Sequence, residues 1–299
     1  MSRRFSLFCW VAVCLLFPAG CGGPSEPSIQ ERIDKAKRLG SPDARAQQLI
    51  RIAKEQAQER DLAGAESTMK AALAACAEVE DPAARAGVYL QLALAQAEMD
   101  NRAEGRKAAK AALEAAESIE DVETKARTLA RVGRVQGATD DAEKAAQTLR
   151  AAKRMAAQLD DMSGRILVLA AVAESYHQIQ QEADADSVIK EAMGLAETIE
   201  DPQEQCKAFT NLAARQHAMG KEKPASETFD SALEVAQKIA DPYKHAYTLT
   251  DVAEQFAKAD LKTKAKEVLA KANEVAKQIK AKDQQEQLEL RIAKLRDEL

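Results

Sequence analysis

Three arginines stand at a spacing that suits a binding function. Arg127, Arg131 and Arg134 are separated by four and three residues, so a helix over this segment would place them on one face. A guanidinium group binds a carboxylate through two parallel hydrogen bonds. We therefore expect Arg127 and Arg134 to receive a carboxylate or an acidic peptide. The alternative is a solvated charged face whose arginines pair with Glu98, with Glu174 or with nothing.

The other reactive side chains form no recognisable catalytic or metal-binding motif. His177 and His217 lie 40 residues apart, and Glu174 is the nearest further ligand for a shared metal. Cys76 and Cys206 lack the spacing of metal ligands, so we expect small buried thiols. No nucleophile–base motif is evident. The sequence therefore predicts a protein that is not an enzyme and binds no cofactor. The alternative is an enzyme or a metal carrier.

The composition favours closely packed helices and argues against nucleic acid as a partner. Apolar residues make up 46% of the 299 residues but aromatic residues only 4%, and alanine supplies much of the apolar content. Strands favour β-branched and aromatic residues, so this mixture suits helices. The net charge is -5, and no basic stripe of the kind that binds phosphate backbones is present.

A regular period organises the elements that must position these side chains. An aspartate recurs every 40 residues, at Asp81, Asp121, Asp161, Asp201 and Asp241. Proline follows three of them, and this pair is typical of a helix start. Numbered from this aspartate, positions 12, 29 and 39 are mostly large and apolar, and positions 13, 25 and 32 are small. The helical spacing predicts two helices in each unit, helix A over positions 2–18 and helix B over positions 23–39.

The pattern of these positions resembles the tetratricopeptide repeat. The first unit carries it at Leu49, Ile52, Ala53, Ala65, Met69 and Ala72. The unit is 40 residues long, where that family usually has about 34. The resemblance implies an all-α fold, a right-handed α-α superhelix (solenoid) of six helix-turn-helix repeats. HEAT repeats have a similar length, but their motif fits less well.

The repeat register predicts the domain organisation. We expect one solenoid over residues 28–299, with a lone helix B over 28–40 and a lone helix A over 281–299 as half-repeat caps. The charged face of the last segment suits a solvent-facing cap. The six repeats between these caps span 41–80, 81–120, 121–160, 161–200, 201–240 and 241–280.

The N-terminal segment resembles a bacterial lipoprotein signal. Arg3 and Arg4 precede an apolar run that is too short to span a bilayer, and small residues then lead to Cys21. The resemblance implies a signal peptide over residues 1–20, lipidation of Cys21, and a flexible tether over 21–27. The two arginines also resemble a twin-arginine signal, which fits less well.

These features imply a lipoprotein anchored to a membrane of the bacterial cell envelope and facing the periplasm. Pro18 stands where lipoprotein signals usually have leucine. A secreted, soluble periplasmic protein is therefore the alternative.

The family resemblance implies that helix A of each repeat lines a concave groove for a partner. The predicted function is a non-catalytic scaffold that binds a protein or peptide there, and the alternative is a self-assembling structural protein that forms homo-oligomers. Leu90 and Leu94 offer an apolar patch, although both could equally belong to the core. The expected groove residues are Arg127, Arg134, Glu174, His177, His217, Tyr247, Leu90 and Leu94.

Overall fold

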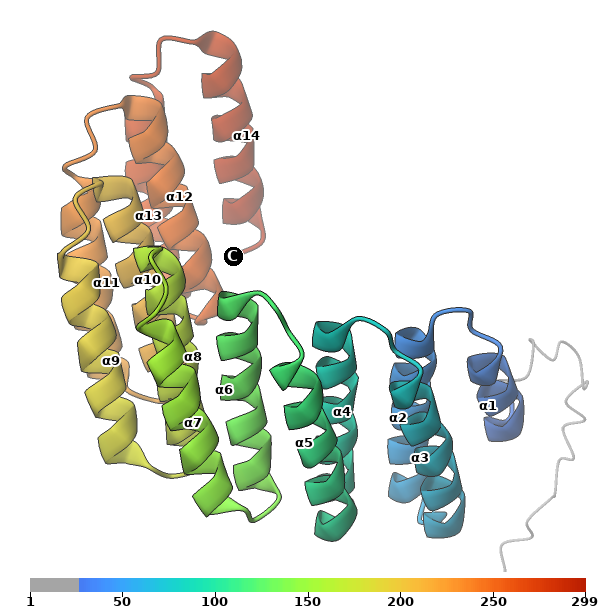
Figure 1. Cartoon of the computed structure of the whole chain (residues 1–299). Helices are drawn as coiled ribbons and strands as arrows, with labels where there is room; N and C mark the ends of the chain where they lie inside the picture. The colour runs from blue at the N-terminus through green and yellow to red at the C-terminus, as the bar shows by residue number, and fades with distance from the viewer. Residues whose placement is uncertain (1–26) are drawn as a thin grey trace, which may run out of the picture.

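The computed structural model describes residues 27–299, which fold into fourteen α-helices with no strand among them (Figure 1). Helix A of the six repeats is α2 (Pro42–Gln58), α4 (Pro82–Glu98), α6 (Val122–Ala138), α8 (Met162–Gln178), α10 (Pro202–Ala218) and α12 (Pro242–Lys258). Helix B is α3 (Leu62–Ala77), α5 (Arg102–Glu117), α7 (Ala142–Ala156), α9 (Glu182–Glu197), α11 (Glu222–Ala236) and α13 (Lys262–Ala276). The expected caps are α1 (Ile29–Lys37) and α14 (Lys282–Asp297).

The recurring aspartate starts each helix A from the second repeat onward. Its carboxylate accepts a hydrogen bond from a backbone N–H two or three residues further on, as Asp81 does from Ala84 and Asp121 from Thr124. Such a cap stabilises a helix by about 1 kcal/mol. Helix A therefore begins and ends at positions 2 and 18, as the sequence predicts.

Helix B ends earlier than the sequence predicts. In the first repeat, α3 covers positions 22–37 instead of 23–39. The residue at position 39 stays in the core, because Val79 is 5% exposed and its N–H bonds to the carbonyl of Cys76. The physical reason is the following cap: the chain must leave the helix before it reaches the extended backbone of Asp81.

Consecutive repeats share one continuous core. Helices A and B pair within each repeat, helix A packs on helix A of the next repeat, and helix B packs on helix A of the next repeat. Alanine at position 32 is 0% exposed in every repeat, which allows close helix approach: Ala72, Ala112, Ala152, Ala192, Ala232 and Ala272. The result is the all-α solenoid that the sequence predicts, and Figure 1 shows that its path bends sharply near α6 and α8.

Glycine allows the tight packing at this bend. Among neighbouring helices A, α6 and α8 make the most extensive contact. A Cβ atom on Gly137 of α6 would collide with Ile179 at the end of α8. A Cβ atom on Gly133 would lie 2.7 Å from Leu149 on α7. Side chains at these two positions would therefore push α6 away from its neighbours.

The last helix ends the array with a polar face. Glu286 and Arg296 of α14 are exposed, whereas the matching positions in the complete repeats are buried. Leu290 is an exception, because it is 72% exposed while position 10 is at most 5% exposed in the six repeats. None of the helices within residues 27–299 has the length and apolar character to cross a membrane. The expected signal peptide, Cys21 and nearly all of the tether lie outside the described residues.

Candidate binding site on the concave face

Helices A form the inner layer of the bent array, since they contact one another in succession and helices B do not. Their side chains at positions 7, 11, 14 and 18 are never buried in the six repeats. We call this surface the concave face. It is the part of the solenoid that a partner can reach from the inside of the bend.

Ion pairs between successive helices A neutralise much of the charge on the concave face. Lys54 of α2 pairs with Glu98 of α4, with Nζ and Oε2 2.6 Å apart. Glu174 of α8 pairs with Arg215 of α10, with Oε2 and Nη1 2.5 Å apart. Glu98 and Glu174 lie on the two helices A that flank α6, and both are therefore already paired with cations, of α2 and α10 respectively.

The arginines of α6 lack comparable partners. Within the described chain, Arg131 and Arg134 make no ion pair, and Arg127 has only Glu123 of its own helix at 3.5 Å. Burial lowers the pKa of Arg131, and the neighbouring guanidinium groups of Arg134 and Arg127 lower it further. We call Arg127, Arg131 and Arg134 the arginine cluster. It concentrates positive charge in the middle of the concave face, and Glu123 is the one carboxylate of the described residues that pairs with it.

The apolar patch expected on the groove is not there as predicted. Leu90 is 2% exposed and belongs to the core, which corrects its assignment to the groove. Position 10 faces the interior in all six repeats, so the side chain packs between helices. Leu94 at position 14 is half-buried and packs against that core from the concave face.

The two histidines lie near the turns within repeats and do not form a metal site. Nδ1 of His177 lies 2.6 Å from Oε1 of Glu182, the first residue of α9. Lys221 contacts the same carboxylate at 3.2 Å. Burial raises the pKa of Glu182, but the hydrogen bonds to Lys221 and His177 outweigh it and lower the pKa. His217 is half-buried at the equivalent position. Throughout residues 27–299, no group of three or more His, Cys, Asp or Glu side chains is placed to hold a metal ion.

The two cysteines of the solenoid are buried and distant from one another. Both are 0% exposed and unpaired. Burial raises the pKa of the Cys76 thiol to about 12 and that of Cys206 to about 11. A neutral, inaccessible thiol is a poor nucleophile. They therefore pack as small apolar residues, as the sequence predicts.

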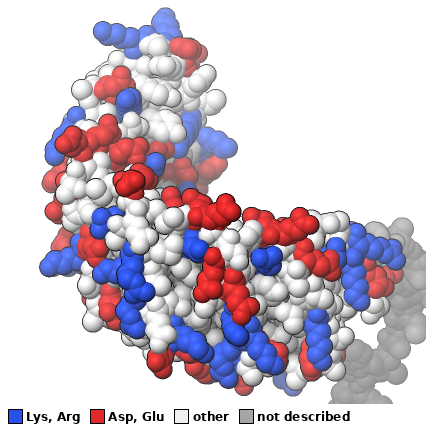
Figure 2. Space-filling model, viewed as in Figure 1, with Lys and Arg blue, Asp and Glu red and all other residues white. Residues whose placement is uncertain are grey.

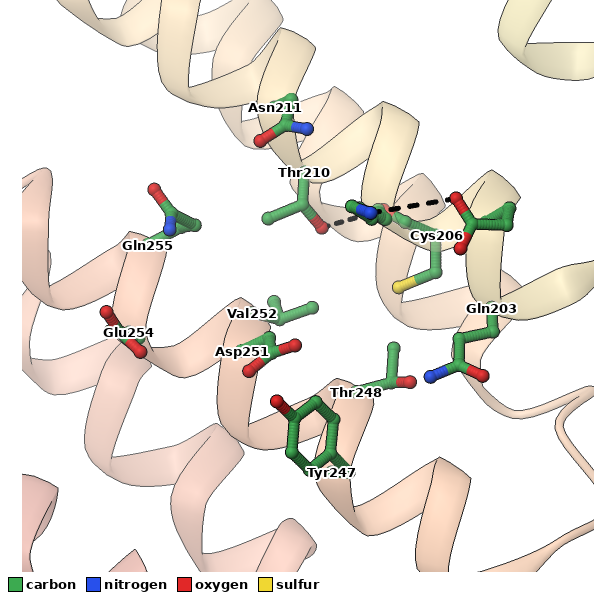
Figure 3. Close-up of a pocket in the computed structure, with 12 residues that line it drawn as sticks. Gln203, Cys206, Thr210, Asn211, Tyr247, Thr248, Asp251, Val252, Glu254 and Gln255 are labelled. Atoms are coloured by element: carbon green, nitrogen blue, oxygen red, sulfur yellow. Dashed lines mark hydrogen bonds and ion pairs between the residues drawn. The ribbon is translucent and has the colours of Figure 1, made fainter. Parts of the chain in front are cut away.

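A pocket of about 330 Å³ opens on the concave face between α10 and α12 (Figure 3). Tyr247, one of the expected groove residues, lines it and is 37% exposed. Thr248 and Asp251 line it as well, and sequence analysis missed both of them. Their positions, 8 and 11, carry different residue types in the six repeats, so the shared pattern did not single them out.

Acidic residues also gather outside the concave face. Figure 2 shows Asp and Glu side chains along the upper edge of the arm that contains α1 to α6. In this arm, the ends of helices B meet the starts of helices A at that edge (Figure 1). Negative charge at a helix start is favourable because it interacts with the helix dipole. The aspartates that cap helices A, such as Asp81 and Asp121, are favourable at this edge for that reason.

Comparison with known proteins gives no family. No family model matches the chain, and no curated protein matches it. Among solved structures, Ton1535 from Thermococcus onnurineus NA1 is 13% identical with a TM-score of 0.42, over 88% of this chain and 94% of that one. A Rap protein in complex with competence and sporulation factor is 15% identical with a TM-score of 0.36, over 89% and 79%.

The TPR-like repeats of a putative kinesin light chain from Podospora anserina are also similar in structure. They are 14% identical with a TM-score of 0.36, over 68% of this chain and 100% of that one. All three TM-scores lie below 0.5, and we infer nothing about function from them.

Proposed function

We propose that this protein is a non-catalytic scaffold that binds an acidic segment of a protein partner on the concave face, through the arginine cluster. The observation that carries this proposal is that Arg131 and Arg134 make no ion pair within the described residues. Cations of other helices A do pair with carboxylates, either of the neighbouring helix A, as in Lys54–Glu98 and Glu174–Arg215, or of their own helix. A carboxylate on a partner would supply what the arginine cluster lacks.

The energetics of the cluster support a partner of opposite charge. Holding three guanidinium groups on one helix face raises the free energy of the unbound protein, because like charges repel at short range. Partial desolvation and the charges of Arg134 and Arg127 all lower the pKa of Arg131. An acidic segment would remove the repulsion, and steering by the cluster would speed association.

The leader supports a location for this activity. A short apolar run followed by small residues and Cys21 is typical of a lipidated envelope protein. We propose that Cys21 carries a lipid anchor and that the solenoid faces the periplasm. The partner would then be another protein of the envelope.

Crosslinking in intact cells tests the proposal. The chain is expressed with its own leader, and captured proteins are identified for the unaltered protein and for a variant with Arg131→Glu and Arg134→Glu. The matched control carries Arg150→Glu and Arg154→Glu, two exposed arginines of α7 with no ion pair among the described residues. We expect the first variant to lose the captured partner and the control to keep it. Equal capture by both variants would remove the arginine cluster from the function.

Self-association is a second candidate, and Leu290 is the observation that favours it. This side chain is 72% exposed at a position that is buried in every complete repeat. Another copy of the chain could cover it and extend the array. Light scattering over a range of protein concentrations tests this candidate. A molar mass that stays at the monomer value excludes it. A molar mass that rises with concentration in the unaltered protein but not in Leu290→Glu supports it.

A further inference from the structure

The residues that line the pocket between α10 and α12 carry more negative than positive charge. Three carboxylates line it, those of Glu204, Asp251 and Glu254, against the single ammonium group of Lys207. Lys207 lies 3.8 Å from Glu204 and Lys258 of α12 lies 2.7 Å from Glu254, which leaves Asp251 without an ion-pair partner on either of these two helices. Figure 3 shows Asp251, Thr248 and Tyr247 on the α12 side and Cys206 and Thr210 on the α10 side. We call this the acidic pocket.

An unsatisfied hydroxyl group provides independent evidence for a ligand. Thr248 is 4% exposed, its side chain lines the acidic pocket, and its Oγ1 atom has no hydrogen-bond partner. Thr210 and Thr250 are buried as well, but each donates to the carbonyl oxygen four residues earlier, at 2.8 Å. A buried polar atom without a partner costs about 1–3 kcal/mol. The wall of the pocket thus contains a hydroxyl group without a hydrogen-bond partner.

The chain already places one cation at the rim of this pocket. Arg291 of α14 donates to Oδ1 of Asp251 at 2.7 Å and to Oε2 of Glu254 at 3.0 Å. Its guanidinium carbon lies 4.8 Å from the centre of the Tyr247 ring, within the range of a cation–π interaction. The hydrogen bonds to Asp251 use Oδ1 only, so Oδ2 remains free to accept.

The pKa of Asp251 agrees with an incompletely neutralised site. Burial raises it, the nearby Glu254 also raises it, and Arg291 and Lys207 lower it without cancelling these effects. A second cation at Oδ2 would stabilise the charged carboxylate.

We propose that the acidic pocket binds the ammonium or guanidinium group of a lysine or arginine side chain on the partner. Asp251 provides the opposite charge, the Thr248 hydroxyl accepts a hydrogen bond, and the Tyr247 ring packs on the aliphatic stem. The partner itself rests on the proposed function, but the chemistry of the pocket does not. The arginine cluster and the acidic pocket would then bind opposite charges of one segment.

Small probes test the pocket without a partner. The full chain in non-ionic detergent is titrated with Nα-acetyl-lysine amide, Nα-acetyl-arginine amide and the uncharged Nα-acetyl-citrulline amide, and binding is followed by saturation-transfer NMR. We expect the two charged probes to bind at least fivefold more tightly than the uncharged one. Asp251→Asn should weaken their binding at least fivefold. Asp230→Asn, at an exposed residue of α11 that makes no ion pair in the described structure, should leave it unchanged.

Thr248→Val separates ligand binding from folding. Valine has nearly the shape of threonine and lacks only the hydroxyl, so the variant should melt at the same temperature or higher because an unsatisfied group is removed. It should nevertheless bind the charged probes several-fold more weakly. A lower melting temperature would mean that the hydroxyl has a partner in the free protein, and would overturn the argument from Thr248.

The remaining outcomes distinguish a free amine from a side chain of the partner as the bound cation. They also distinguish the proposal for the acidic pocket from the proposal for the arginine cluster. If 1,5-diaminopentane binds as tightly as the lysine probe while a lysine-containing peptide does not bind, the pocket takes a free amine and a partner side chain is ruled out. Equal binding of charged and uncharged probes overturns the proposal altogether. Failure of the crosslinking experiment, with probe binding intact, would remove the arginine cluster and leave the acidic pocket standing.

Discussion

Single residues at the turns within repeats adopt a backbone conformation that costs free energy. Position 20 has a positive φ in all six repeats, and only the fifth repeat places glycine there. The other five are Arg60, Asp100, Asp140, Gln180 and Asp260, with φ between 57° and 67°. The following N–H bonds back to the helix, as Gln181 does to the carbonyl of Tyr176 at 2.9 Å, so the conformation is needed to end helix A.

A pair of substitutions measures this cost. Gln180→Gly should raise the free energy of unfolding by about 1 kcal/mol, because glycine reaches positive φ without steric strain. Gly220→Ala should lower it by about the same amount or more. Urea unfolding followed by circular dichroism measures both. A Gln180→Gly variant that is no more stable than the unaltered chain would contradict the expectation.

The buried thiols predict both a reactivity and a pH dependence. In the native state, the unaltered protein and the Cys76→Ala and Cys206→Ala double variant should have the same number of thiols that react with a disulfide reagent, because both side chains are buried. In guanidinium the double variant should have two reactive thiols fewer than the unaltered protein. Reaction of either thiol in the native protein would contradict their burial.

The sign of the pH effect follows from the direction of the shifts. Burial raises the pKa of Cys76 from 9.0 to about 12 and that of Cys206 from 9.0 to about 11. Below pH 9 both states keep the protons, so the thiols contribute no pH dependence. As the pH rises from 9 towards 11, the unfolded chain loses protons that the folded chain retains, and stability falls. Chemical unfolding at pH 8 and pH 10.5 should show a smaller loss in the Cys76→Ala and Cys206→Ala double variant.

At the scale of the helices, the sequence predicted the elements better than their surfaces. The starts of helix A follow from Asp81 and its equivalents, because capping is a local interaction that a period of 40 residues makes visible. The end of helix B depends on the turn that follows, and the sequence placed it two or three residues too late. Leu90 was misassigned because helical periodicity does not tell which of two apolar positions faces a neighbouring helix.

The proposed binding surfaces depend on contacts between side chains of different repeats, and the periodicity of the sequence does not predict these contacts. Arg127 and Arg134 were recognisable from their spacing. That neither arginine pairs with a neighbouring helix A follows only from the structure, in which Glu98 and Glu174 bind other cations. The acidic pocket was missed for the same reason, since Asp251 and Thr248 acquire their roles from α10 and α14.

Gly137 should control the packing of α6 on α8. In Gly137→Ala, the new methyl group would collide with the β-branched Ile179, so we expect a loss of about 1–3 kcal/mol of stability. Gly194 of α9 is the matched control, because a Cβ atom there meets nothing within 4 Å. Gly194→Ala should stabilise the protein by up to about 1 kcal/mol through higher helix propensity. Urea midpoints compare the two, and equal shifts would mean that the bend does not depend on glycine.

At the scale of the whole molecule, both candidate sites lie on the inside of one bent array. The arginine cluster is on α6, and the acidic pocket lies further along, between α10 and α12. A segment that follows the concave face would meet positive charge first and negative charge later. If a partner binds at both sites as proposed, the fold would select the order of charges along that partner, a property that the net charge of -5 does not describe.

The proposed lipid anchor would decide where this surface works, and Cys21 is the residue that tests it. A 13-residue apolar run, residues 5–17, is too short to hold the chain across a bilayer, which needs about 20 residues. If the cysteine carries the lipid, Cys21→Ser should move the protein from the membrane fraction to the soluble periplasmic fraction. Pro18→Leu, which restores the usual residue of such signals, should leave it in the membrane. Membranes are washed with high salt first, which removes protein held only by charge. A Cys21→Ser protein that still sediments with washed membranes would show that the leader or a bound partner, and not a lipid, holds the solenoid there.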